Sequence, residues 1–170
     1  MTLANEVRRR EGHLHLLAKI LISSLVMPLL YNGLGVSVMY PDGWKIEEDG
    51  TEENSVNFES PLGAFLTITR YPKLDFSDAV EKAHQVMLAE YDEVESEDFS
   101  RTIAGREFNV TALRFVYLDF LIVAELFSFL LGGSTYLVQI QGEDRDVEKL
   151  QPVFQAMLTS LFQKAESLTS

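Results

Sequence analysis

The side chain in this sequence best suited to acid–base catalysis is His84, which lies in a stretch with helical periodicity. A general base needs a nucleophile or an acid within hydrogen-bond reach, and no Gly-x-Ser-x-Gly nucleophile motif accompanies this histidine. The segment Gly132-Gly133-Ser134-Thr135 has the composition of a hairpin turn and lacks the lysine of a phosphate-binding loop. We therefore expect His84 to lie on the surface or in the packing face of a helix, and we expect no catalytic residues.

Acidic side chains occur in two runs, Glu47–Glu53 and Glu90–Asp98, that could offer oxygen ligands to a hard cation. Neither run has the Asp-x-Asp-x-Asp-Gly spacing with a distant glutamate of a calcium loop, so solvated segments are favoured, although the second run would suit a basic partner. The sequence contains no cysteine, which excludes thiol catalysis, Cys-ligated zinc, iron–sulfur clusters and disulfides. We expect neither a metal nor a cofactor.

The most distinctive cluster is Tyr40-Pro41-Asp42-Gly43-Trp44, followed closely by acidic residues. Tryptophan concentrates binding energy at interfaces, so this cluster is a candidate anchor for a partner. The sequence favours a structural role instead, in which Trp44, the only tryptophan, fills the edge of the core behind the turn. The partner surface predicted from these residues comprises Tyr40, Asp42, Trp44, Glu47 and Glu48.

The composition is that of one folded domain of 170 residues, with 46% hydrophobic residues and a net charge of −12. The first 34 residues are basic on balance, so the remaining chain carries the acidic excess. Such a field repels phosphate backbones, which argues against nucleic-acid binding, and attracts a basic protein or a cation. The acidic charge is also what keeps many small proteins soluble. Homo-oligomer formation stays open.

Residues 1–30 form a distinct segment, expected to be an amphipathic helix or a targeting segment ahead of a domain over residues 31–170. Basic residues followed by an apolar run resemble a secretory signal peptide, but Lys19 interrupts the run and no small-x-small cleavage site follows. The alternatives are a packed helix and a start of the chain at Met27. Cytoplasmic and secreted or membrane-attached locations, and membrane contact itself, stay open. The helical face would consist of Leu14, Leu17, Leu21 and Leu25.

Beyond this segment, the periodicity predicts four strands, a helix, four strands and a final helix. Turn residues separate neighbouring strands at Leu118-Asp119 and Gly132-Gly133, and residues 92–98 read as an acidic connection. The final helix starts at Asp144 or Asp146 and is broken or started afresh at Pro152. The predicted strands cover residues 35–40, 44–46, 55–58, 64–71, 99–103, 107–117, 121–131 and 135–141, and the first of these helices covers residues 75–91.

Hairpin-length connections require antiparallel pairing, which excludes a doubly wound parallel sheet. The segment Leu121–Leu131 is apolar on both faces of the expected strand, and a strand of that kind is covered on both sides. We therefore predict an α+β fold, a three-layer α-β-α sandwich around an antiparallel sheet. The helix expected over residues 14–27 is a candidate cover for one face.

Two stretches resemble the PsbP-like family. Residues Val36–Trp44 resemble its strand-Tyr-Pro-x-Gly-Trp opening, and Tyr136–Gly142 with Pro152-Val153-Phe154 and Ser160-Leu161 is similar to its ending. The resemblance covers roughly residues 31–163. It implies an antiparallel sheet between helices, the fold of extrinsic photosystem II subunits, a Ran-binding nuclear import factor, bacterial envelope lipoproteins and chaperones of secreted effectors.

The resemblance implies docking to another macromolecule, because none of those groups is known chiefly for catalysis. The function expected is therefore that of a non-enzymatic protein-interaction or assembly module. One alternative is a secreted or membrane-attached envelope protein, although the lipidation cysteine of the envelope lipoproteins is missing. Another is a chaperone for a hydrophobic segment, with residues 14–27 occupying its binding face. A third is an enzyme that uses His84 and Asp42.

Overall fold

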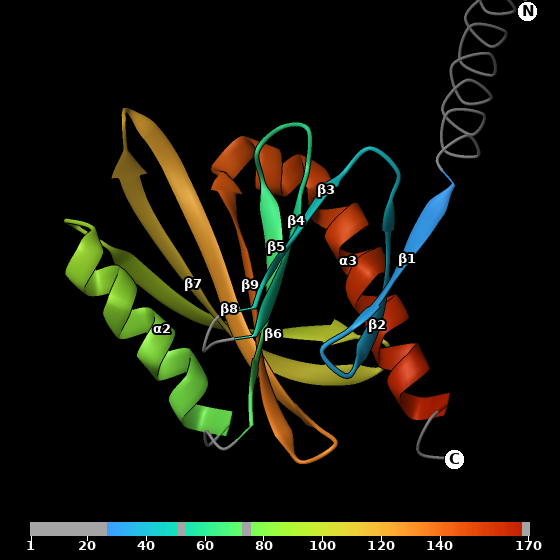
Figure 1. Ribbon diagram of the computed structural model, residues 1–170. Helices are drawn as coiled ribbons and strands as arrows, with labels where there is room; N and C mark the ends of the chain where they lie inside the picture. Colours follow the sequence, from blue (N-terminus) through green and yellow to red (C-terminus); the bar gives the residue numbers. More distant parts are fainter. Residues whose placement is uncertain (1–26, 51–53, 73–75, 168–170) are drawn as a thin grey trace, which may run out of the picture.

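The computed structural model describes residues 27–50, 54–72 and 76–167 (Figure 1). In this part of the chain, five strands precede a helix, and four longer strands precede a second helix. The elements are β1 (Pro28–Gly33), β2 (Val36–Pro41), β3 (Lys45–Asp49), β4 (Ser55–Glu59), β5 (Phe65–Tyr71), α2 (Phe76–Glu90), β6 (Glu95–Ile103), β7 (Arg106–Tyr117), β8 (Phe120–Leu131), β9 (Ser134–Glu143) and α3 (Asp144–Ser167).

Seven strands form one sheet in the order β3-β4-β5-β9-β8-β7-β6, while β1 and β2 pair with each other. Every neighbouring pair is antiparallel. The strands β6 to β9 form a meander, and β5 joins it by pairing with β9. The absence of parallel pairs agrees with the short connections predicted from the sequence.

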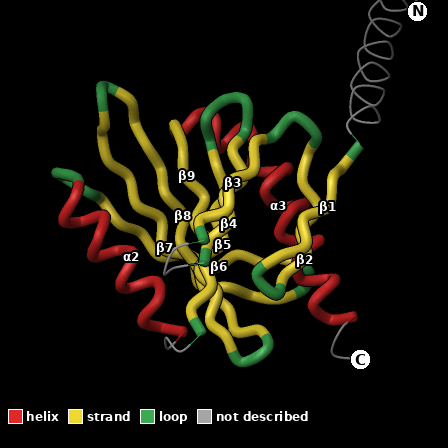
Figure 2. Tube along the Cα trace, in the orientation of Figure 1, coloured by secondary structure: helices red, strands yellow, loops and turns green. Residues whose placement is uncertain are grey.

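The molecule has three layers, with α2 against one face of the sheet and α3 against the other (Figures 1 and 2). The β1–β2 hairpin lies beside α3 and extends that layer. Strand β8 explains the arrangement, because it is apolar on both faces. Val123 and Phe127 belong to the core under α3, whereas Ala124 and Leu126 belong to the core under α2. The predicted α-β-α sandwich is therefore the observed fold.

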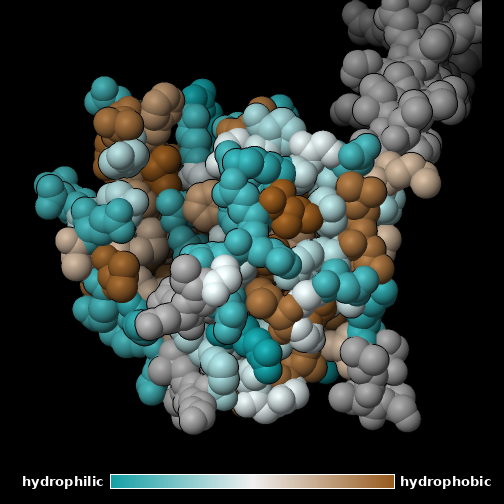
Figure 3. Space-filling view, viewed as in Figure 1, coloured by the Kyte–Doolittle hydropathy of each residue, from teal (hydrophilic) through white to brown (hydrophobic). Residues whose placement is uncertain are grey.

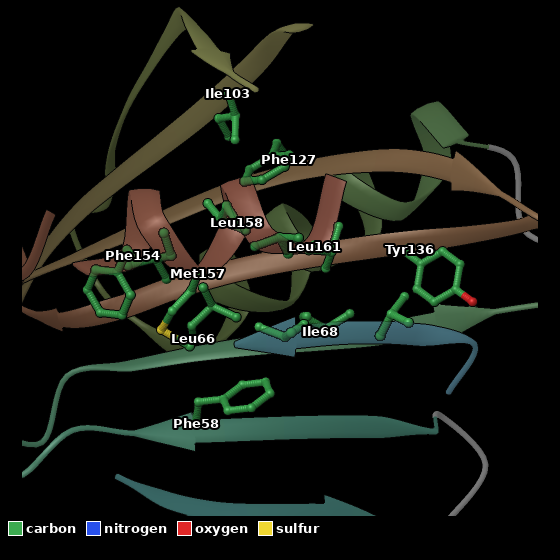
Figure 4. Packing of buried hydrophobic residues seen from close by; sticks show 14 of the residues in the cluster. Phe58, Leu66, Ile68, Ile103, Phe127, Tyr136, Phe154, Met157, Leu158 and Leu161 are labelled. Atoms are coloured by element: carbon green, nitrogen blue, oxygen red, sulfur yellow. The ribbon is translucent and has the colours of Figure 1, made fainter. Parts of the chain in front are cut away.

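The larger core fills the space between the sheet and α3 (Figure 4). Phenylalanine rings from three elements meet there: Phe162 of α3 stacks on Phe108 of β7 at a centroid distance of 4.8 Å and meets Phe129 of β8 edge to face at 4.9 Å. Full burial of one such side chain contributes roughly 1.5–3 kcal/mol. The helix α3 is consequently the main source of apolar burial on this face.

The smaller core lies under α2 and contains Met87 from the helix and Leu113, Phe115, Ala124 and Leu126 from the sheet. At its edge the ring of Tyr91 stacks on Phe115 with a centroid distance of 4.0 Å. This contact fixes the carboxyl-terminal end of α2 over strand β7.

Strand β1 was not predicted, because Pro28 reads as the end of a helix and the strand has only six residues. A two-residue turn at Leu34-Gly35, with φ angles of 52° and 79°, pairs β1 with β2. The acidic connection predicted over residues 92–98 is also partly wrong, since β6 begins at Glu95. An edge strand tolerates such charges because its outer side faces water.

The prediction that Pro152 breaks the last helix is wrong, because α3 runs without interruption from Asp144 to Ser167. Proline lacks the backbone N–H and displaces the carbonyl four residues earlier. Pro152 is exposed, so water can solvate the freed carbonyl group, while the adjacent turns remain held by the core.

The helix predicted over residues 14–27 lies outside the described residues except for Met27, and the described chain enters β1 at Pro28. Neither α2 nor α3 is long and apolar enough to cross a membrane.

The close approach between β9 and the start of β5 gives a test of this packing. A Cβ atom at Gly142 would lie 2.7 Å from Ala64 Cβ, 2.9 Å from Ala64 Cα and 3.2 Å from Val147 Cγ2. We expect Gly142→Ala to lower the free energy of unfolding by about 1–3 kcal/mol, because backbone has to move, as measured by urea unfolding. Gly50→Ala, where no atom lies within 4 Å of the new Cβ, is the matched control. Equal stability of the two variants would contradict the packing.

Candidate partner-docking surface

The aromatic part of the predicted partner surface points into the protein. The ring of Tyr40 lies 5.5 Å from that of Phe58, centroid to centroid. Trp44 meets Phe154 of α3 edge to face, with a centroid distance of 5.6 Å and an interplanar angle of 78°. Both side chains are half-buried and pack against the larger core. Trp44 therefore fills the rim of the core behind the turn, as the sequence favoured.

The acidic part of the predicted surface lies on the outside. Asp42 sits in the turn before β3, where its Oδ1 accepts a hydrogen bond of 2.8 Å from the backbone N–H of Gly43. Glu47 forms an ion pair with Lys45 on the same face of β3. The five predicted residues therefore do not converge on one site: two face the core and three face solvent.

Glu48 lies on the opposite face of β3 from Glu47, beside the hydroxyl group of Tyr31. Burial raises the pKa of Tyr31, and the neighbouring Glu48 carboxylate raises it further. The ring of Tyr31 meets Phe58 edge to face at 5.6 Å. Glu48 therefore links β3 to Tyr31, a residue by which the β1–β2 hairpin packs on the core.

His84 lies half-buried on α2, and its Nε2 atom has no hydrogen-bond partner within residues 27–50, 54–72 and 76–167. No group of three or more histidine, aspartate or glutamate side chains in those ranges is arranged to hold a metal ion.

A buried ion pair that sequence reasoning missed lies between the sheet and α3. Glu125 occurs in the otherwise apolar strand β8, and its side chain is 9% exposed. Arg101 of β6 donates two hydrogen bonds to its carboxylate, from Nη1 at 2.7 Å and from Nη2 at 2.9 Å. Nε2 of Gln151 on α3 lies 3.2 and 3.3 Å from the same two oxygens. The carboxylate is fully partnered, so the cluster joins β6, β8 and α3.

The ion pair gives a second test. We expect Arg101→Met to lower the free energy of unfolding by about 3–5 kcal/mol, because it leaves the Glu125 carboxylate buried without its counter-charge. The double variant Arg101→Met/Glu125→Leu removes both charges and should recover most of that loss in denaturant unfolding. A double variant that is less stable than the single one would show that the pair is not the buried unit described.

The densest group of exposed apolar side chains in the described part of the chain lies at the tip of the β7–β8 hairpin (Figure 3, upper left). Strand β6 accompanies β7 only as far as Arg114, and β9 accompanies β8 only from Ile122. The hairpin therefore continues beyond the sheet as a two-stranded terminal ribbon, residues 116–121. Its exposed apolar residues are Val116, Tyr117, Leu118, Phe120 and Leu121.

The terminal ribbon is apolar on both faces. Val116 pairs with Leu121 on one face, and Tyr117 pairs with Phe120 on the other. An isolated two-stranded hairpin is marginally stable in water, and a strand that is apolar on both faces is normally covered on both. The ribbon is anchored at its base, where Tyr117 meets Tyr91 of α2 edge to face at 5.8 Å. Beyond this contact its apolar side chains remain open to solvent.

The turn at the tip of the ribbon is strained. Leu118 and Asp119 have φ angles of 49° and 65°, the pattern of a type I′ turn, which asparagine and glycine normally occupy. Leucine in this left-handed region costs about 1 kcal/mol, and the side chain of Leu118 is 72% exposed, so packing does not offset that cost. The other two-residue hairpin turns of the described chain each end in glycine. Leucine at this position thus works against stability.

We expect Leu118→Asn to raise the free energy of unfolding by about 0.5–1 kcal/mol, because asparagine tolerates the left-handed conformation. Denaturant unfolding measures the change. Leu62→Asn is the control, since Leu62 is also exposed in a turn but has no positive φ. A gain at both positions, or a loss at Leu118, would refute the assignment of strain to the tip.

A second apolar feature is a groove of about 680 Å³ between the β1–β2 hairpin and the outer side of α3. Pro28, Met39 and Tyr40 line one side, and Val153 and Met157 line the other. Polar groups in the groove are amides and hydroxyls, and the Ser160 hydroxyl accepts a 2.9 Å hydrogen bond from the backbone N–H of Met39. This bond ties the hairpin to α3.

The arrangement of the sheet, its flanking helices and the accessory hairpin is the PsbP-like fold. The solved structure of cyanobacterial PsbP from Synechocystis matches with a TM-score of 0.53 and 14% identity, covering 80% of this chain and 92% of that one. Weaker matches are PA94, a protein of unknown function from Pseudomonas aeruginosa (TM-score 0.48, 13% identity, 79% and 95% covered), and LpqN, involved in cell envelope biogenesis of Mycobacterium tuberculosis (0.42, 11%, 78% and 86%). No family model and no curated protein matches the sequence. The likeness to cyanobacterial PsbP establishes the fold and no activity.

Proposed function

We propose that this chain is a non-enzymatic protein-interaction or assembly module that docks to its partner through the terminal ribbon. The observation that carries the proposal is the exposure of both apolar faces of the ribbon, together with its leucine tip. Exposed apolar patches of this kind mark interaction sites in soluble proteins.

The composition of the ribbon supports this proposal. Tyr117 and Phe120 form a cross-strand aromatic pair, and large aromatic side chains dominate the binding energy of many interfaces. The ring stack of Tyr91 on Phe115 holds the base of the ribbon, so the anchors are already in place before a partner binds. The strained turn lowers the stability of the fold while it presents an apolar side chain to solvent. Such a combination is typical of binding sites.

Two further considerations favour a docking role over catalysis. The sequence resemblance to PsbP-like proteins implies docking to another macromolecule, although a fold by itself does not fix a function. The side chains considered as catalytic, His84 and Asp42, come from α2 and from the turn before β3, and the hydrogen bonds described for Asp42 stay within that turn.

Site-specific crosslinking in the source cells tests the proposal. A photo-reactive amino acid at position 118 should give one discrete protein adduct, whereas the same group at Leu62, which is also an exposed apolar turn residue, should not. Introducing Val116→Thr, Tyr117→Thr and Phe120→Thr into the chain that carries the reactive group at 118 should reduce the adduct at least tenfold, since threonine keeps strand propensity but removes most of the apolar contact.

The proposal is wrong if position 118 gives no discrete adduct, or if positions 118 and 62 give the same adducts. It is equally wrong if the threonine variant, shown by circular dichroism to be folded, crosslinks like the wild type.

A further inference from the structure

We infer that the partner receives the terminal ribbon in an apolar slot whose rim carries basic side chains. The inference rests on the proposed function and adds to it the shape and the charge of the partner's site. Shape comes from the two apolar faces of the ribbon, and charge comes from the residues at its base.

A slot, rather than a flat surface, is the complementary shape. The two cross-strand pairs of the ribbon point in opposite directions, so a flat partner would cover only one of them. The ribbon extends three residues beyond the last sheet-supported pair, a reach of roughly 10 Å at the rise of a β-strand. A slot that contacts both pairs and the Leu118 tip would bury every exposed apolar side chain of the ribbon.

Acidic side chains lie along the side of the ribbon's base that faces the end of α2 and the start of β6. The contact of Tyr91 with Tyr117 places the end of α2 and the α2–β6 connection beside it, and β6 begins opposite Arg114, next to the last supported residues of β7. We call the exposed carboxylates of this segment the acidic collar: Glu90, Asp92, Glu93 and Glu95.

The arginines at the same level do not balance the acidic collar. Arg114 lies 3.5 Å from a carboxylate oxygen of Glu97, and Nε of Arg145 donates a 2.9 Å hydrogen bond to Glu143. Arg114 of β7 is thus already paired with a carboxylate of the neighbouring strand β6, and Arg145 at the start of α3 with one at the end of β9. The base of the ribbon therefore has a negative field, and a partner that meets it must supply basic groups around its apolar slot.

The same field argues against two other occupants. Anionic lipid headgroups would be repelled by the acidic collar, whereas loops that insert into such membranes carry basic residues around their apolar tips. A second copy of the chain would bring an identical acidic collar against the first, and like charges at a rim oppose association. A basic protein surface is the occupant that fits both the apolar ribbon and the acidic collar.

The test neutralises the acidic collar without touching the ribbon. The collar variant carries Glu90→Gln, Asp92→Asn, Glu93→Gln and Glu95→Gln. It is compared with a control of equal charge change in the position-118 crosslinking assay, run here in a lysate of the source cells so that the salt concentration can be set. That control carries Asp42→Asn, Glu47→Gln, Glu48→Gln and Glu148→Gln. Three of these residues belong to the partner surface predicted from the sequence, so the control also tests whether that surface binds the partner.

At low salt we expect the adduct yield of the collar variant to fall roughly tenfold, and that of the control variant to remain within about twofold of wild type. Raising the salt to about 0.5 M should bring the wild-type yield down toward that of the collar variant, because screening removes the same attraction. The adduct should contain a protein with basic residues at the crosslinked site.

The inference is overturned, with the proposed function intact, if the collar variant crosslinks like wild type at both salt concentrations while the threonine ribbon variant does not. It is also overturned if the adduct is a dimer of this chain, or if the control variant is the one that loses crosslinking. Binding of the wild type, but not of the ribbon variant, to vesicles of phosphatidylcholine with phosphatidylserine in a flotation assay would assign the ribbon to membranes instead.

Discussion

Strand β8 can be stable only when both of its faces are covered, and most of the architecture follows from this requirement. One face packs under α3 and the other under α2, with Phe127 and Leu126 pointing to opposite cores. Because the strand lies near the centre of the sheet, covering it places the two helices on opposite sides. The three layers are thus a consequence of one apolar segment that has no polar side.

Acidic side chains of the sheet include one inside β8 and several along the two edge strands. Glu125 is the one carboxylate in the middle of β8, and the fold accommodates it with Arg101 and Gln151 rather than exposing it. At the two edges of the sheet, β3 and β6 carry acidic side chains on strands that have a neighbour on only one side. Charged edges of this type oppose pairing between molecules. The terminal ribbon is the exception, since it leaves apolar side chains uncovered where β7 and β8 continue past the ends of β6 and β9.

Local pattern was enough to predict β7, β8 and β9, their turns and the two faces of β8, because alternation and turn residues act over a few positions. It missed the acidic first residues of β6. It failed where neighbours distant in sequence decide the outcome. β1 exists because it pairs with β2, which packs on α3, and α3 continues through Pro152 because its apolar face is anchored on the sheet. The partners of Glu125 come from two other elements, so no spacing along the chain could identify them. For the predicted partner surface, Trp44 packs against the core as the sequence favoured, whereas the inward direction of Tyr40 depends on Phe58 of β4, which no local pattern identifies.

The pairing of β5 with β9 has a consequence for how the protein is made. Phe65 of β5 pairs with Gln141 of β9, so the seven-stranded sheet stays open until β9 has left the ribosome. Until then, β5 presents an unpaired inner edge, and the residues of β4 and β5 that later pack under α3 have no cover. Such closure between distant segments is slow compared with hairpin formation, because a long loop must be ordered before the contacts form. Strands β3 to β5 therefore depend on β9 and α3 to become a stable structure. Truncated chains from interrupted synthesis would be aggregation-prone fragments rather than folded subdomains.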